Sequence, residues 1–162
     1  MLHKRIAFYP CCSTDFAEPY DILNSLVDHI IFCDISKSAK ILFDSQETLF
    51  PKATFWLKDA LDAIKEINQI DVFFYRSDSA GEGGSGLYFF GDNIFPHLVE
   101  KFNPKGAMII SDGSNARGSN WRKIKRNNGS IKYSRKFKPA VEQKYYSIKG
   151  NGPLLTIYVY PI

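Results

Sequence analysis

Short apolar runs alternate with amphipathic stretches along the first two thirds of the chain. Arg5–Tyr9 (RIAFY) stops at Pro10 and His29–Cys33 (HIIFC) stops at Asp34, so both runs predict buried strands. Between them, apolar residues recur at helical spacing from Pro19 onward. Two strands joined by one helix predict a parallel pair with a right-handed crossover.

The middle of the chain continues this alternation. Lys40–Phe43 (KILF) predicts a short third strand or an irregular link, and a wide apolar face predicts one helix over Pro51–Asn68. Asp71–Tyr75 (DVFFY) and Gly106–Ser111 (GAMIIS) predict two more buried strands, with a helix over Asn93–Phe102 between them.

Turn residues replace helices in the last third. The segments 127–129 (Asn-Asn-Gly) and 150–153 (Gly-Asn-Gly-Pro) separate runs of β-forming residues, which predicts antiparallel hairpins. The predicted class is α/β: a Rossmann-like, mostly parallel sheet with helices on both faces and a C-terminal antiparallel hairpin. We expect one domain over residues 1–162.

Composition supports a packed globule, because 44% of the 162 residues are hydrophobic and 15% are aromatic. No apolar run approaches the roughly 18–20 residues of a membrane span, and the N-terminus lacks the apolar core of a signal peptide. The three cysteines have no zinc-binding spacing and do not suit a disulfide scaffold, so we expect reduced thiols and a cytoplasmic location.

Charge is distributed unevenly. Residues 1–100 carry 8 Lys/Arg and 15 Asp/Glu, a net of −7, whereas residues 101–162 carry 13 Lys/Arg and 2 Asp/Glu, a net of +11. Segregation of this kind bears on binding partners rather than on the fold.

Each predicted parallel strand ends in a polar or glycine-rich loop. These loops are Pro10–Asp15, Asp34–Ser36, Ser77–Gly86 and Asp112–Ser119. Ligands of open α/β sheets bind at the carboxyl ends of the strands, so four such loops predict a cleft there. Alternatively, these are ordinary loops in which Asp or Ser caps the next helix.

The order of elements, with an antiparallel pair after the last parallel strand, resembles the class I S-adenosylmethionine-dependent methyltransferase fold. In that family the loop after the first strand holds the cofactor, and an acid that ends the second strand binds the ribose hydroxyls. The acid at the matching position here is Asp34. The resemblance therefore implies a set of cofactor-binding residues, namely Pro10, Cys12, Ser13, Asp15, Asp34 and Asp78.

Two motifs depart from that family. The first loop reads Pro-Cys-Cys-Ser-Thr and lacks the glycines that let a backbone approach a ligand. After Asp71–Tyr75 the chain reads Arg-Ser-Asp-Ser, not the Asn/Asp-Pro-Pro-aromatic signature of amino methyltransferases. These departures favour a scaffold without its cofactor, and they leave the catalytic residues unknown.

Other candidate chemistry is sparse. Cys11 or Cys12 could act as a nucleophile, but no histidine partner is recognisable, and small buried cysteines are common. Four strand-end aspartates could bind a divalent cation, although helix caps explain them as well. They are Asp15, Asp34, Asp78 and Asp112, and we predict no metal site.

The segment Arg117–Lys138 combines many basic residues with interleaved aromatic ones. Such a hairpin could neutralise phosphates while its aromatic side chains stack on bases, or it could contact an acidic protein surface. The alternative is a solvated hairpin whose alternate residues pack inward. The predicted partner-binding residues are Arg117, Trp121, Arg122, Lys123, Lys125 and Arg126.

Two functions remain open. We favour a non-catalytic, cofactor-free protein that binds a protein partner, in the general style of the bacterial immunity proteins that neutralise a cognate toxin. The alternative is a methyltransferase that uses S-adenosylmethionine, binds its ribose through Asp34, and acts on nucleic acid or a small molecule through the basic hairpin. Neither function involves a membrane.

Overall fold

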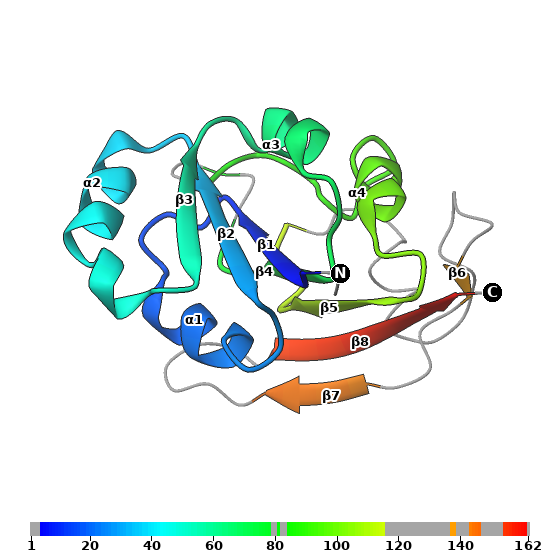
Figure 1. Cartoon of the computed structure of the whole chain (residues 1–162). Coiled ribbons are helices and arrows are strands. Elements are labelled where there is room, and N and C mark those ends of the chain that lie inside the picture. Colours follow the sequence, from blue (N-terminus) through cyan, green and yellow to red (C-terminus); the bar gives the residue numbers. More distant parts are fainter. Residues whose placement is uncertain are drawn as a thin grey trace.

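The computed structural model describes residues 4–78, 81, 84–115, 137–138, 143–146 and 154–161. The predicted partner-binding residues between Arg117 and Arg126 lie outside the described residues. In chain order (Figure 1), the elements are β1 (Ile6–Pro10), α1 (Ala17–Leu23), β2 (His29–Asp34), α2 (Lys37–Ser45), the 3₁₀ helix η1 (Glu47–Leu49), β3 (Ala53–Leu57), α3 (Ala60–Glu66), β4 (Val72–Tyr75), α4 (Phe95–Lys101), β5 (Ala107–Ser111), β6 (Phe137–Lys138), β7 (Gln143–Tyr146) and β8 (Leu154–Pro161).

The strands form one sheet in the order β3-β2-β1-β4-β5-β8-β6, with β7 also paired to β8. Strands β1 to β5 run parallel to one another, and β8 runs antiparallel to β5 and β7. The predicted class, a Rossmann-like sheet with a C-terminal antiparallel pair, is confirmed. The strand order reverses between β1 and β4, which is where ligands bind in open α/β sheets.

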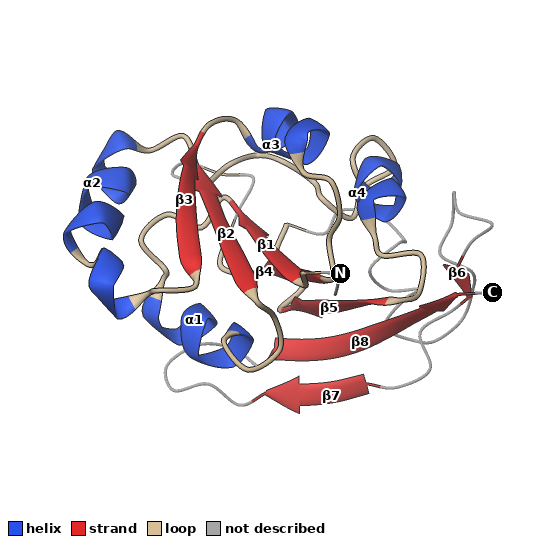
Figure 2. Cartoon of the chain, viewed as in Figure 1, coloured by secondary structure: helices blue, strands red, loops and turns tan. Residues whose placement is uncertain are grey.

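Alternate residues of each central strand face opposite sides of the sheet. Ala7 and Tyr9 pack with α1 and α2, whereas Phe8 packs with α3 and α4. Figure 2 shows these two helix pairs on opposite faces of the sheet. The strands are buried on both faces, and this is why they read as continuous apolar runs in the sequence.

The predicted helix over Pro51–Asn68 is wrong in its first half. Residues 53–57 form β3, which pairs in parallel with β2 along its whole length, from Ile30 opposite Ala53 to Asp34 opposite Leu57. The strand then turns, and the Asp59 carboxylate accepts a hydrogen bond from the Leu61 amide at 2.8 Å to begin α3. The apolar residues of β3 and α3 follow one another so closely that, in the sequence, they resemble the apolar face of one helix.

The strand or link predicted at Lys40–Phe43 is also wrong, because these residues lie within helix α2. The Ser36 side chain caps this helix by accepting a hydrogen bond from the Ala39 amide at 3.2 Å. Ala39 and Phe43 are the buried residues of the helix, four positions apart on one face.

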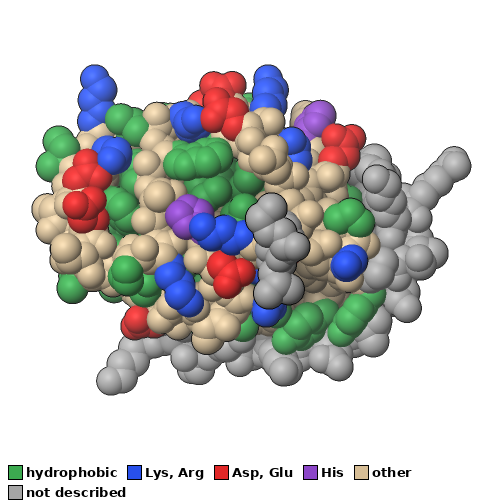
Figure 3. Space-filling model, viewed as in Figure 1, with side chains coloured by type: hydrophobic (Ala, Val, Ile, Leu, Met, Phe, Trp, Pro, Cys, Tyr) green, Lys and Arg blue, Asp and Glu red, His purple; other side chains and the backbone are tan. Residues whose placement is uncertain are grey.

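The other elements predicted within residues 4–115 agree with the structure to within a few residues, and the predicted pairing of the last two runs is confirmed as β7 and β8. The hairpin predicted around the turn at residues 127–129 lies outside the described residues. None of the described helices is long and apolar enough to cross a membrane. Figure 3 shows acidic and basic side chains interspersed on one face, with hydrophobic side chains at the surface around the edge strand β3. The single domain over 1–162 and the cytoplasmic location stay predictions.

Candidate functional site

A cavity of about 390 Å³ opens at the carboxyl ends of β1, β2, β3 and β4. It therefore lies at the strand ends beside the point where the strand order reverses. One wall comes from the loop after β4. The lining residues are Cys11, Ser13, Asp34, Ile35, Ser36, Lys58, Asp59, Ala60, Ser77, Asp78, Gly84, Ser85 and Leu87.

The carboxylate of Asp34 is held at the end of β2 by backbone amides. The Ser13 amide donates to Oδ2 at 2.8 Å, and the Ser36 amide donates to Oδ1 at 2.9 Å. Each oxygen of an ionised carboxylate can accept two hydrogen bonds, so both oxygens can still accept one more from a ligand. The next residue, Ile35, lines the same cavity and is 71% exposed.

Among the residues that the structure describes, four in the loops that follow the strands have left-handed backbone conformations although none is glycine. Their φ angles are 56° at Cys11, 50° at Ser13, 57° at Ser77 and 52° at Asn115. Each such residue costs about 1–3 kcal/mol and persists only where its surroundings hold it. The loop after β1 therefore takes up, without glycine, backbone angles that glycine adopts freely.

The loop after β4 is tied back to its own strand through Asp78. The Asp78 carboxylate accepts hydrogen bonds from the Tyr75 hydroxyl, from the Ser85 amide at 2.8 Å and from the Ser85 hydroxyl. Ser85 also bonds the thiol of Cys11. These contacts bring the loops after β1 and β4 together on one side of the cavity.

The cysteines are not activated as nucleophiles. Burial raises the pKa of Cys11 to about 12, although its contact with Ser85 acts in the opposite direction. Cys12 is 2% exposed, and burial raises its pKa well above the ordinary value as well. A thiolate is the reactive form, so both environments oppose nucleophilic chemistry at neutral pH.

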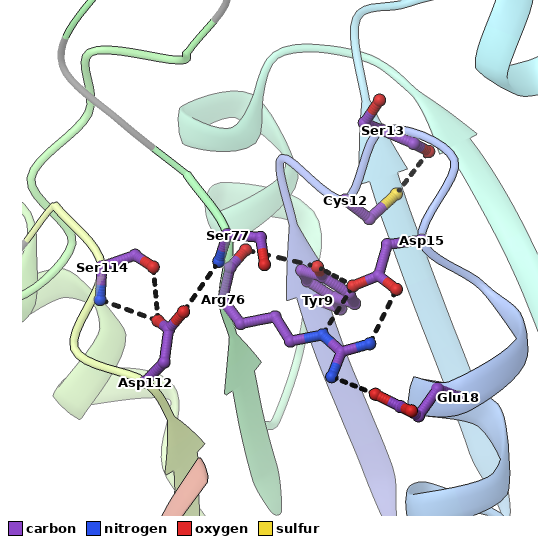
Figure 4. A network of polar contacts seen from close by, with 9 residues as sticks. All are labelled: Tyr9, Cys12, Ser13, Asp15, Glu18, Arg76, Ser77, Asp112 and Ser114. Carbon is purple, nitrogen blue, oxygen red and sulfur yellow. Dashed lines mark hydrogen bonds and ion pairs between the residues drawn. The ribbon is translucent and has the colours of Figure 1, made fainter. Parts of the chain in front are cut away.

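A second polar cluster joins the loop after β1 to the end of β4 (Figure 4). The Arg76 guanidinium donates to Asp15 through Nε at 2.7 Å and through Nη2 at 2.8 Å, and its Nη1 donates to Glu18 at 2.5 Å. The Tyr9 hydroxyl donates to Asp15 Oδ2 at 2.6 Å. We call these four residues the Arg76 cluster.

Asp112, at the end of β5, serves local structure. It accepts hydrogen bonds from the Ser77 amide at 3.1 Å and from the Ser114 amide at 2.8 Å, as Figure 4 shows. Within the described part of the chain, no group of three or more His, Cys, Asp or Glu side chains is arranged to hold a metal ion.

The structure divides the predicted cofactor-binding residues into two groups. Ser13, Asp34 and Asp78 line the cavity, whereas Pro10, Cys12 and Asp15 do not.

Sequence reasoning missed Lys58 and Asp59, which line the cavity from the end of β3. The sequence does indicate these two residues, because they form a charged pair directly after the apolar run of residues 55–57. Asp34 stands in the same way at the end of the apolar run that forms β2. Cys11 belongs to the predicted Pro10–Asp15 loop but not to the predicted set of cofactor-binding residues, and it lines the cavity beside Ser13.

Comparison with known proteins gives a fold. No family model and no curated protein sequence matches the chain. A methyltransferase from Geobacter sulfurreducens superposes with a TM-score of 0.60 at 12% identity, covering 96% of this chain and 71% of that one. SMU.1697c from Streptococcus mutans, a proposed methyltransferase in complex with S-adenosylhomocysteine, gives 0.58 at 12% identity, covering 99% and 91%. The chain has the class I methyltransferase fold.

A third structure is TrmK from M. capricolum in complex with S-adenosylhomocysteine, its natural cofactor product. It superposes with a TM-score of 0.53 at 14% identity, covering 96% of this chain and 62% of that one. These matches contradict our favoured prediction of a non-catalytic, cofactor-free immunity protein, because proteins of this fold include methyltransferases, two of them in complex with S-adenosylhomocysteine. They support the alternative that we kept open, a methyltransferase. The missing glycines misled the interpretation, since the loop reaches a left-handed conformation without them.

Proposed function

We propose that this chain is a methyltransferase that binds S-adenosylmethionine in the cavity at the carboxyl ends of β1 to β4. The observation that carries the proposal is the Asp34 carboxylate, which ends β2 and lines this cavity beside the switch point of the sheet. The fold shared with methyltransferases supports the same assignment.

The residues around Asp34 fit an adenosine group. Two vicinal ribose hydroxyls can donate to the carboxylate lone pairs that the amides of Ser13 and Ser36 leave free. The exposed side chain of Ile35 offers an apolar surface to the adenine ring, and burial of that side chain would add a hydrophobic contribution to binding. We assign Asp34 to the ribose and Ile35 to the base.

Bound in this cavity, S-adenosylmethionine supplies an electrophilic methyl group on a positively charged sulfur. The chain's own contribution is to orient the reactants, because a fixed geometry replaces a bimolecular encounter. The loops that carry Ser13 and Asp78 form neighbouring parts of the cavity wall, and their contacts with Asp34 and Tyr75 anchor them to β2 and β4. The acidic lining also favours a cationic ligand.

We propose nucleic acid as the methyl acceptor. Residues 101–162 carry a net charge of +11, and a basic, aromatic-containing segment suits phosphates and exposed bases. RNA binding that weakens steeply between 50 and 200 mM salt is the expected result on this proposal. An affinity that does not change with salt would exclude this acceptor class.

Isothermal titration with S-adenosylmethionine and S-adenosylhomocysteine tests cofactor binding. Hydrogen bonds to charged groups contribute about 1.5–3 kcal/mol, so Asp34→Asn should weaken binding by about tenfold to a hundredfold. Asp21→Asn, which removes an exposed carboxylate on α1, is the matched control and should bind like the unaltered chain. A thermal unfolding curve for each variant checks that the fold is retained.

The proposal is wrong if the unaltered chain binds neither compound at millimolar concentration. It is also wrong if Asp34→Asn binds both compounds as tightly as Asp21→Asn does. Either result would remove the function assigned to the cavity.

A further inference from the structure

We propose that Arg76 is a positioning residue of the cofactor site: by clamping Asp15, it holds the loop Cys11–Asp15 in the left-handed conformation that shapes the cavity wall. This inference rests on the proposed function, because it concerns how the same cavity is kept ready for its ligand. It adds a residue that lies outside the cavity lining.

The contact between Arg76 and Asp15 has the geometry of a clamp. Two guanidinium nitrogens bond the two oxygens of one carboxylate, at 2.7 and 2.8 Å. Such a bidentate pair fixes the orientation of the carboxylate as well as its position. Arg76 follows β4 directly and Asp15 precedes α1, so the clamp ties the far end of the loop to the neighbouring strand.

Burial makes the clamp rigid. The Arg76 side chain is 2% exposed and its guanidinium lies 5.6 Å from the centre of the Phe74 ring. Burial alone would lower the pKa of Arg76, but the hydrogen bonds to Asp15 and Glu18 raise it, so the side chain stays charged. A buried arginine of this kind needs its carboxylate partners, and removal of one leaves a poorly compensated charge.

Tyr9 adds a second restraint on the same carboxylate. It is 1% exposed, and its hydroxyl bonds Asp15 at 2.6 Å. Burial and the neighbouring Asp15 raise the pKa of Tyr9, so it remains a hydrogen-bond donor. Asp15 is therefore held from β1 and β4, the two strands that flank the switch point.

The loop between the end of β1 and Asp15 contains the two residues with strained backbone angles. Cys11 and Ser13 have φ angles of 56° and 50°, and Ser13 lies two positions before Asp15. The Ser13 amide, turned by this conformation, donates to Asp34 at 2.8 Å. If the clamp opens, the loop can relax toward an ordinary backbone conformation, and the amide then moves away from Asp34.

A merely structural role makes a different prediction. An ion pair that only stabilises the fold would change the melting temperature without a specific effect on the ligand site. Glycine substitution in the loop would then not compensate for loss of the ion pair. If the clamp instead holds the loop in its left-handed conformation, glycine in the loop should restore ligand affinity after the clamp is lost, because glycine adopts left-handed angles without steric cost.

The test is a set of single and double variants with S-adenosylhomocysteine as the titrated probe. Asp15→Asn should weaken binding by at least about tenfold, a change of about 1.4 kcal/mol. Adding Ser13→Gly should restore the affinity to within about threefold of the unaltered chain. Arg76→Lys, which keeps the charge but loses the planar fork, should weaken binding as Asp15→Asn does, and it serves as the second variant if Asp15→Asn does not fold.

The chain offers matched controls for both parts of the experiment. Ser77→Gly replaces the same residue type at nearly the same angle, φ 57°, in the same cavity wall but outside the clamped loop, so it should not restore binding. Glu18→Gln removes the other carboxylate of Arg76, which belongs to α1 and is 36% exposed. Because the bidentate contact of Arg76 with Asp15 stays in place, this variant should lower the melting temperature without weakening binding.

The inference is overturned if Asp15→Asn and Arg76→Lys bind normally, if Ser13→Gly fails to restore binding, or if Ser77→Gly restores it equally. A chain that binds no S-adenosylhomocysteine refutes the proposed function instead, and the clamp is then tested without ligand. The alkylation rate of Cys11, measured by peptide mapping, should rise by about fivefold or more in Asp15→Asn and stay within about twofold in Glu18→Gln. Equal rates in the two variants would refute the clamp.

Discussion

Replacement of Phe16 by alanine tests the packing of the region where the structure departs from the sequence prediction. Phe16 is 2% exposed and precedes α1. Its ring centroid lies 5.2 Å from Phe32, 5.3 Å from Phe43, 6.0 Å from Phe55 and 6.1 Å from Phe50. One side chain therefore joins α1 to β2, α2 and β3, as well as to the segment that connects α2 with β3.

The expected loss is large because a Phe→Ala cavity in a core costs about 3–5 kcal/mol. Each aromatic pair adds about 0.5–1.5 kcal/mol beyond area burial, so Phe16→Ala belongs at the upper end of that range. A shift of about 2–4 °C per kcal/mol then gives a melting temperature lower by about 8–20 °C.

Urea unfolding followed by circular dichroism measures this loss. Ile41→Ala is the control, because Ile41 lies on α2 but is 69% exposed, and we expect a change within about 0.5 kcal/mol. A Phe16→Ala loss below about 1.5 kcal/mol would mean that α2 and β3 do not pack around this ring.

Three further predictions concern titration and the amino ends of the central strands. The alkylation rate of Cys11 should rise about tenfold per pH unit from pH 8 to 10 without a plateau, because its pKa is about 12; a plateau below pH 9 would contradict this burial. Burial also raises the pKa of Cys12 and that of Cys33, the latter to about 12. As the pH rises, the unfolded chain therefore loses its thiol protons before the folded chain does. Above pH 8.5 the free energy of unfolding should fall by up to about 1.4 kcal/mol per pH unit for each thiol. A free energy of unfolding that stays constant from pH 8.5 to 10 in urea titrations would refute this prediction. Asp71→Ala removes the acceptor of hydrogen bonds from the Ile6 backbone amide and the Asn103 side-chain amide. We expect urea unfolding to show a loss of about 2–4 kcal/mol in stability and calorimetry to show unchanged cofactor binding. A folded Asp71→Ala variant that binds the cofactor more weakly would contradict this prediction.

The sequence was sufficient for the central strands because their burial on both faces leaves a plain apolar signature. It was not sufficient for the edge strand β3, because only Phe55 of this strand is buried and the strand therefore lacks a continuous apolar run along its whole length. Phe55, Trp56 and Leu57 run directly into Leu61 and Ile64 of α3, and together these residues imitate one helical face. Periodicity alone does not separate a short strand from the helix that follows it.

The same error limited the prediction of the site. Asp34 was identified because it ends a recognised strand, whereas Lys58 and Asp59 were missed because the strand before them was not recognised. The loop after β1 was misjudged for a different reason. Residue types indicate which backbone angles are sterically favoured, and neither Cys11 nor Ser13 is of a type that predicts the left-handed angles that both adopt.

A crystal structure of the chain with S-adenosylhomocysteine tests the assignment of the cavity most directly. We predict that the ribose hydroxyls lie within hydrogen-bond distance of the Asp34 carboxylate and that the adenine ring lies against Ile35. The ligand should leave the Ser13 amide bonded to Asp34, as it is without ligand. S-adenosylhomocysteine bound away from the carboxyl ends of β1 and β2, or absent from crystals soaked at millimolar concentration, would contradict the proposed function.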